Sequence, residues 1–248
     1  PVITALFKRE WRRLEKLSGP MIIEKCCHDM DIISWIANSK AKKVSSFASQ
    51  TRFVPRNDAG ENCNECKLSE SCRYNPKKLS PFQGANEPSP VKRENNKAKN
   101  DLCVFNSDKD TPDQQIVNIE FENGILANFS LSIDQPIGGR SIRINGTEGQ
   151  LFGSYDESII KIKYHKKNEK NEIIEEQIKI EHDKSGHNGG DSFITKYFKD
   201  ILKGNFQTPR AGLKEGIDAF LIGYAAELSR REDRNIKMEE LYKAIYGE

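Results

Sequence analysis

The chain has 248 residues, and its 39 lysines and arginines against 37 acidic residues give a formal net charge of +2. This balance argues against nucleic acid or an anionic membrane surface as the partner, and no apolar run approaches the roughly 20 residues that span a bilayer. We therefore expect a cytoplasmic protein that acts on a small molecule. The chain opens at Pro1 without an initiator methionine, from which we expect a fragment or a processed chain.

The first strong pattern is an apolar repeat at helical spacing from Gly19 to Asn38, which predicts one largely buried helix. Glu24, His28, Asp31 and Trp35 follow at i, i+4, i+7 and i+11 and fall on one stripe of that helix. A carboxylate beside an imidazole orients the ring and favours its charged form, so the stripe is a candidate general acid/base site. The alternatives are a solvated polar stripe or a core histidine satisfied by the carboxylates.

The elements that follow are mostly strands. One strand is predicted over 44–53, and the segment Glu122-Asn123-Gly124 between 116–121 and 125–133 is a hairpin signal. Shorter strands are predicted at 141–145, 150–152, 159–164 and 173–180, and helices at 192–202, with Asp191 as N-cap, 213–229 and 238–246. The order predicts an α+β fold, with one open, mostly antiparallel sheet, helices on one face and a single domain over 1–248.

A polar loop insertion at about 57–103 carries most of the cysteines. Cys63, Cys66, Cys72 and Cys103 offer four thiolates, two of them at the spacing of a zinc knuckle. A structural zinc ion could pin a loop that has no core of its own. Reduced free thiols are the alternative reading.

A dinucleotide cradle is missing from the sequence. Such a cradle needs G-x-G-x-x-G between a strand and a helix, because the pyrophosphate contacts bare backbone at the helix N-terminus. No two glycines of this chain are separated by one residue. The chain therefore contains no self-contained site for a dinucleotide.

The segment from Gly19 to Ile36, GPMIIEKCCHDMDIISWI, resembles the helix that opens the active site in the glucose–fructose oxidoreductase / inositol dehydrogenase / rhizopine-catabolism (Gfo/Idh/MocA) family. Further matching segments follow in the family's order: Trp11-Arg12-Arg13, Asp113 to Asn118, Gly146 to Gly149, His187 to Asp191 and Ala225 to Ser229. The resemblance covers nearly the whole chain. It implies the fold of that family's C-terminal domain, with the N-terminal Rossmann domain absent from the chain.

The resemblance also implies an activity, which is hydride transfer between NAD or NADP and a secondary alcohol of a sugar, inositol or related polyol. His28 matches the family's acid/base, and Glu24 matches the acidic residue that supports it, where many members have aspartate. Candidate substrate contacts are Lys25, Asp31, Arg12 and His187, although an ion pair with Asp29 would explain Lys25 equally well.

The partners implied are the protein's own N-terminal Rossmann domain and further copies, in a homodimer or tetramer formed through the open sheet face. Two other functions stay open. One is an NAD-dependent glycoside hydrolase or lyase on the same scaffold, and the other is a non-catalytic, metal-stapled binding module.

The missing cradle gives a direct prediction. This chain alone should bind NAD or NADP far more weakly than a complete dehydrogenase does, because it has no helix N-terminus built to receive the pyrophosphate. Isothermal titration calorimetry on the 248-residue chain measures this. A micromolar dissociation constant would contradict the missing-domain argument.

Overall fold

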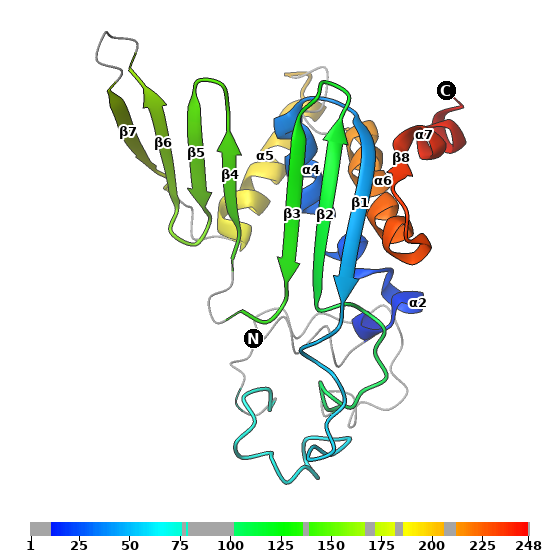
Figure 1. The fold of residues 1–248 in the computed structure, drawn as a ribbon. Coiled ribbons are helices and arrows are strands. Elements are labelled where there is room, and N and C mark those ends of the chain that lie inside the picture. Colours follow the sequence, from blue (N-terminus) through cyan, green and yellow to red (C-terminus); the bar gives the residue numbers. More distant parts are fainter. Residues whose placement is uncertain are drawn as a thin grey trace. The chain divides into compact units, whose positions relative to one another are not determined.

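The computed structural model describes residues 11–75, 78, 102–135, 139–166, 172–181, 186–205 and 212–247. The chain divides into two compact units, one formed by Pro1–Gln135 with Ala211–Glu248 and the other by Pro136–Arg210. Each unit holds one four-stranded antiparallel sheet (Figure 1). The α+β class and the antiparallel pairing are confirmed, but the strands form two sheets where the sequence predicted one.

The sheet of the first unit has the strand order β3-β2-β1-β8. Its strands are β1 (Ala41–Ser49), β2 (Gln114–Phe121), β3 (Leu126–Ser132) and β8 (Ile236–Lys237). The hairpin between β2 and β3 is confirmed, and Gly124 supplies the positive φ of 85° that its turn requires. The first strand ends four residues before the predicted end, because the Asp113 carboxylate accepts the backbone N–H groups of residues 51–53 and turns the chain there.

Helices cover one face of this sheet. Helix α6 (Leu213–Glu232) and α7 (Met238–Tyr246) pack on β1, while α3 (Met21–Glu24) and α4 (Cys27–Ala37) pack on α6. The strand residues that face this layer are almost fully buried: Val44, Val117, Ile119 and Phe121. The prediction of helices on one sheet face is confirmed for this unit. No helix among the described residues is long and apolar enough to cross a membrane.

The single helix predicted from Gly19 to Asn38 is interrupted, so that prediction was wrong in its continuity. The break lies at Lys25 and Cys26, between α3 and α4. There the Cys26 N–H reaches back to the Met21 carbonyl at 3.4 Å, one residue farther than in an α-helix, and the Cys26 carbonyl accepts from both Asp29 and Met30. Glu24 before the interruption and His28 after it therefore do not lie on one stripe of a continuous helix.

The second unit contains β4 (Ser141–Asn145), β5 (Gly149–Ser154), β6 (Ile159–His165) and β7 (Ile173–Lys179), paired in chain order. A short 3-10 turn (Gly186–Gly189) and helix α5 (Gly190–Leu202) follow. The predicted helix is present but begins two residues early, with Gly189 as N-cap. Asp191 is therefore not the cap; it lies in the first turn and pairs with His187 at 2.8 Å.

The described part of the loop insertion has a small core, contrary to the prediction of a loop without one. Residues 76, 77 and 79–101 of the insertion lie outside the described residues. Phe53 is fully buried and its ring contacts those of Tyr74 and Phe105, with centroids 5.3 and 5.8 Å away. Val104 and Cys103 complete the buried cluster. Aromatic packing therefore orders this segment.

We expect Phe53→Ala to lower the free energy of unfolding by about 3 kcal/mol, because it opens a cavity in a small core that has few ways to collapse. Chemical denaturation measures the loss, and amide exchange should accelerate mainly in residues 59–75 and 102–105. Phe198→Ala is the matched control, since Phe198 is 60% exposed on α5. Equal effects of the two substitutions would contradict the aromatic core.

Candidate active site

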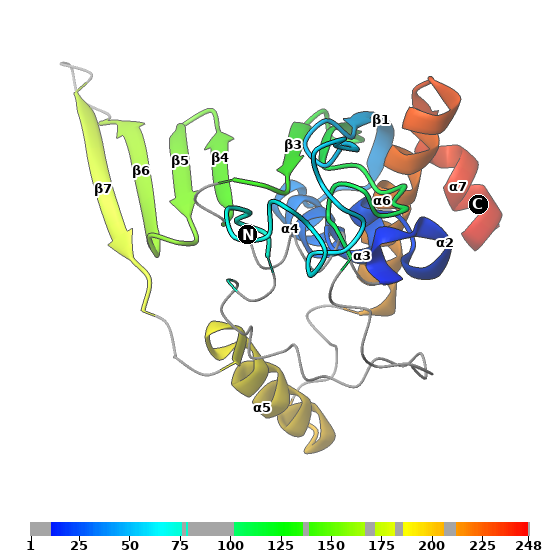
Figure 2. The ribbon, with the colours of Figure 1, turned by 90° about the horizontal axis from the view of Figure 1, so that it is seen from below.

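The residues of the predicted acid/base site lie at the start of the first unit. A 3-10 turn (Trp11–Arg13) leads into α2 (Glu15–Ser18), and the chain then passes through α3 into α4. These short helices contact one another in sequence, and α3 and α4 both rest on α6 (Figure 2). The site is therefore built from consecutive turns held on one long helix.

Glu24 and Arg12 form an ion pair in this region. The Arg12 Nε donates to Glu24 Oε1 at 2.8 Å, and the Glu24 side chain is 17% exposed. The Arg12 guanidinium also lies over the Trp11 ring, 4.6 Å from its centroid. The second carboxylate oxygen, Glu24 Oε2, is buried and finds no hydrogen-bond partner in the described part of the chain.

The predicted pairing of Glu24 with His28 is not formed. The helix break at Lys25 and Cys26 separates the two residues, so the i, i+4 geometry of a continuous helix does not apply. The guanidinium of Arg12 also offers a permanently charged donor to the carboxylate. Arg12, predicted as a substrate contact, lies against Glu24.

His28 is exposed in the first turn of α4. No described residue forms a hydrogen bond with its ring. Two neighbours on the same helix, Met30 and Ala37, are buried and face the core. The structure therefore places His28 away from the core, and the reading as a satisfied core histidine is not supported.

The remaining candidate contacts lie in different surroundings. Lys25 is exposed at the helix break and Asp31 is half-buried on α4. His187 belongs to the second unit, where its side chain is 86% exposed and its Nδ1 lies 2.8 Å from Asp191 Oδ1. The structure brings together Arg12 and Glu24, with His28 and Lys25 close in sequence.

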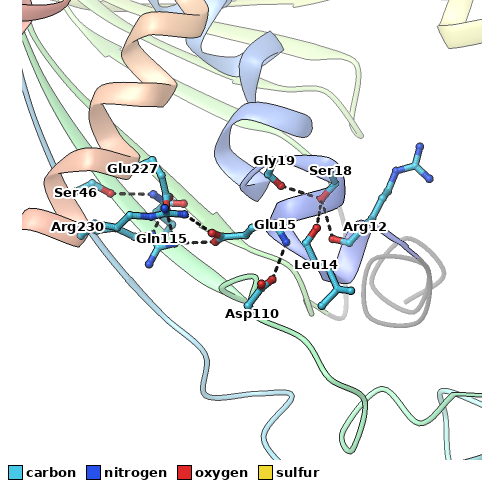
Figure 3. Close-up of polar contacts among 11 residues, drawn as sticks. Arg12, Leu14, Glu15, Ser18, Gly19, Ser46, Asp110, Gln115, Glu227 and Arg230 are labelled. Atoms are coloured by element: carbon cyan, nitrogen blue, oxygen red, sulfur yellow. Dashed lines mark hydrogen bonds and ion pairs between the residues drawn. The ribbon is translucent and has the colours of Figure 1, made fainter.

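A second polar cluster, which the sequence analysis missed, ties α2 to α6. The Glu15 carboxylate pairs with Arg230 at 2.8 Å (Figure 3). It also pairs with Arg231. Both arginines bind Glu227 as well, whose side chain is only 5% exposed. The Glu15 N–H donates to Asp110 Oδ1 at 2.8 Å. Spacing of i+3 and i+4 from Glu227 to the two arginines was the sequence signal for this cluster.

Buried hydrogen bonds extend this connection into the sheet. Gln115 Nε2 on β2 donates to Ser46 Oγ on β1 at 3.0 Å (Figure 3). The Ser46 N–H donates to Ser229 Oγ of α6 at 3.0 Å. Ser229 Oγ in turn donates to the carbonyl of Arg234 at 2.7 Å. These contacts fix α6 against the sheet on which the site depends.

The described residues do not support the predicted zinc site. They contain no group of three or more metal-binding side chains arranged to hold an ion, although Cys63, Cys66, Cys72 and Cys103 all line one hollow of about 420 Å³. Cys63 and Cys103 are buried, and Cys66 Sγ accepts the Gly60 N–H at 3.3 Å. Cys103 belongs to the aromatic cluster and Cys72 packs against it, as small apolar side chains do.

The chain belongs to a known family of oxidoreductases. Residues 4–238 match the family described as "Oxidoreductase family, C-terminal alpha/beta domain", as the resemblance to Gfo/Idh/MocA proteins implied. The chain is 23% identical, over 96% of its length, to a Bacillus subtilis (strain 168) protein named "Putative oxidoreductase YteT", of which it covers 60%.

Solved structures share the fold. A levoglucosan dehydrogenase in complex with NADH and levoglucosan aligns with a TM-score of 0.60 and 14% identity, over 92% of this chain and 53% of that one. An oxidoreductase domain protein from Kribbella flavida aligns with a TM-score of 0.61 and 14% identity, over 92% and 54%. The chain spans about half the length of these structures.

The pKa of Glu15 gives a pH prediction for the α2–α6 cluster. Burial, and then repulsion by Glu227, raise that pKa above its usual 4.5, against the lowering effect of Arg230 and Arg231. From pH 4.5 upward the folded chain then holds this proton more strongly than the unfolded chain, so the contribution of Glu15 to stability falls as pH rises. The free energy of unfolding of Glu15→Gln should therefore rise relative to that of the wild type as the pH increases from 4.5 to the raised pKa of Glu15.

Denaturation midpoints measured at several pH values test this, with Glu240→Gln as a control of opposite sign. The hydrogen bond from Arg234 lowers the pKa of Glu240. Glu240 therefore stabilises the folded chain above pH 4.5, and this stabilisation is lost in acid. The free energy of unfolding of Glu240→Gln should fall relative to that of the wild type as pH rises. The same pH trend in both variants would contradict the assignment for Glu15.

Proposed function

We propose that this chain is the substrate-binding and catalytic part of a nicotinamide-dependent oxidoreductase that acts on a secondary alcohol of a sugar or polyol. The observation that carries the proposal is the placement of His28, an exposed imidazole in the first turn of α4 in a chain of this oxidoreductase family. An imidazole that binds no described residue is available to a substrate hydroxyl.

His28 moves the hydroxyl proton in this proposal. During alcohol oxidation the substrate O–H bond breaks and its proton passes to an imidazole nitrogen of His28. The C–H bond of the same carbon also breaks, its hydride would pass to the nicotinamide, and a carbonyl forms at that carbon. The sequence carries no G-x-G-x-x-G turn, so we assign the binding of the hydride acceptor to residues outside this sequence. We therefore assign only proton transfer and substrate positioning to this chain.

Glu24 and Arg12 support this site. The ion pair fixes one carboxylate oxygen of Glu24, and the second oxygen is buried and has no hydrogen-bond partner among the described residues. Leaving a buried acceptor unsatisfied costs about 1–3 kcal/mol, so Glu24 Oε2 favours a hydrogen-bond donor that arrives with substrate or with the rest of the protein. Arg12 is then a positioning residue, while Lys25, Asp31 and His187 are proposed substrate contacts.

A sugar or polyol is the proposed substrate class, and the shared fold with a levoglucosan dehydrogenase that binds NADH and levoglucosan supports it. Self-association through the open sheet face is also part of the proposal. On that face Phe47 and Ile116 are register partners on adjacent strands, and both are exposed. Burying such a pair would favour contact between copies.

We expect His28→Ala in the full-length protein to lower kcat/KM by about 10²–10⁴-fold, the usual cost of removing a general acid/base. Glu24→Gln should cost less, because it keeps a hydrogen-bonding side chain beside the site. The measurement is turnover of a panel of sugars and polyols with NAD and NADP. His165→Ala, at the exposed end of β6, is the control histidine.

Activity of His28→Ala close to that of the wild type would overturn the proposal. A variant that does not fold, judged by circular dichroism, would instead indicate a structural role for His28. Product analysis separates the rival hydrolase or lyase, because that reaction would recycle the cofactor and leave no net oxidation of the sugar.

A further inference from the structure

Two of the four cysteines that line the hollow in the loop insertion share one turn. The Cys66 N–H donates to the Cys63 carbonyl at 3.3 Å and closes a four-residue turn. The first and fourth Cα atoms of such a turn lie within about 7 Å, and disulfides join Cα atoms about 4.4–6.8 Å apart. Both thiols are reduced in this structure. The backbone therefore holds them within reach of a disulfide bond.

The two thiols of this turn differ in exposure. Cys63 is buried, whereas Cys66 is half-buried. The Gly60 N–H donates to Cys66 Sγ at 3.3 Å and orients the sulfur. A Cβ atom added at Gly60 would lie 3.3 Å from Cys66 Cα, so the close approach at this point suits glycine. Because reactivity requires access, Cys66 is the thiol that an external reagent meets first, and Cys63 is its buried partner.

Arginines set the charge of the hollow. Its lining includes Arg52, Arg56 and Arg73 and, among the described residues, no aspartate or glutamate. Asp134 pairs with Arg52 and Arg73, and Asp58 pairs with Arg56, although neither aspartate lines the hollow. Three positive against two negative charges leave one net positive charge here. A hollow of about 420 Å³ with three guanidinium groups therefore favours a small anionic molecule.

We propose that Cys66 and Cys63 form a reversible thiol–disulfide pair that is oxidised by an anionic disulfide of low molecular weight. The Cys66 thiolate attacks one sulfur of this reagent, the S–S bond of the reagent breaks, and one half leaves as a thiolate. The Cys63 thiolate then attacks Cys66 Sγ of the mixed disulfide, and the second half leaves. The pair loses two electrons and two protons, and the reagent takes them up as two thiols.

The turn is fixed to the segment that carries the aromatic core. The Cys103 N–H donates to the Glu61 carbonyl at 2.8 Å, and Asn62 pairs with Leu102 in an isolated β-bridge. Cys103 itself is part of the aromatic cluster, so packing accounts for it without a redox role. A disulfide inside the turn forms while the core stays packed.

Oxidation of the full-length protein by two matched reagents tests the proposal. Dithiodipropionate is a dianion and cystamine is a dication of similar length, and both are disulfides. Trypsin releases residues 57–67 as a peptide whose only cysteines are Cys63 and Cys66. After alkylation of the remaining thiols, mass spectrometry should find this peptide unalkylated and two hydrogens lighter. It should form several-fold faster with dithiodipropionate than with cystamine, and excess dithiothreitol should reverse it.

Three results would overturn the proposal. One is a disulfide that links the peptide 57–67 to the peptide of Cys72 or of Cys103. Another is oxidation at the same rate by both reagents, or faster oxidation by cystamine. The third is failure of both reagents to oxidise the peptide, and zinc found in the native protein by elemental analysis would then identify a metal site instead.

Variants separate the charge of the hollow from its structure. Arg56→Gln should slow oxidation by dithiodipropionate several-fold without slowing oxidation by cystamine, because it removes one of three positive charges. Arg56→Lys should keep the preference for the dianion. Cys66→Ser should abolish the disulfide in the peptide 57–67, whereas Cys72→Ser, the matched control at the same hollow, should leave it unchanged. An undiminished preference in Arg56→Gln would contradict the anionic reagent, and loss of the disulfide in Cys72→Ser would contradict the pair.

Discussion

The close packing of α3 and α4 on α6 is the constraint that fixes the candidate site. Helix α6 presents small residues on its buried side, among them Ala219, Ala225 and Ala226. A Cβ atom added at Gly223 would already lie 3.4 Å from the Ile23 side chain and 3.5 Å from the Ile22 carbonyl. A larger side chain would push α3 outward and shift the helix break that sets the direction of His28.

Ion pairs add to the apolar packing that positions the short helices on α6. Glu15, Glu227, Arg230 and Arg231 join α2 to the end of α6. Partly buried pairs of this kind contribute little net stability, because desolvation offsets the Coulomb attraction. Their effect here is to define one arrangement of the turns that lead to Arg12 and Glu24.

The sequence predicted the regular elements well where long periodic patterns existed. The strand at Ser141–Asn145 and the helix at Met238–Tyr246 have the predicted bounds, and the Asn123-Gly124 turn forms its hairpin. The break at Lys25 and Cys26 escaped prediction because the apolar spacing continues through it. Strand β8 escaped because two residues cannot show an alternation.

The candidate site was predicted only in part. His28 was identified from its place in a family-like segment, and its exposure is consistent with that role. The partner of Glu24 was predicted wrongly, because helical spacing does not reveal a distant arginine that returns to the same carboxylate. The cysteines suggested zinc by their spacing, but the pattern carried no information on the aromatic cluster formed by Phe53, Tyr74 and Phe105.

In the proposed function, substrate binds this chain at the start of α4. A crystal structure of the full-length protein with reduced cofactor and a bound sugar or polyol would show whether it does. We expect a substrate hydroxyl oxygen within about 3 Å of an imidazole nitrogen of His28, with the reacting carbon turned toward the nicotinamide. A substrate bound productively away from α3 and α4, with His28 in solvent, would contradict it.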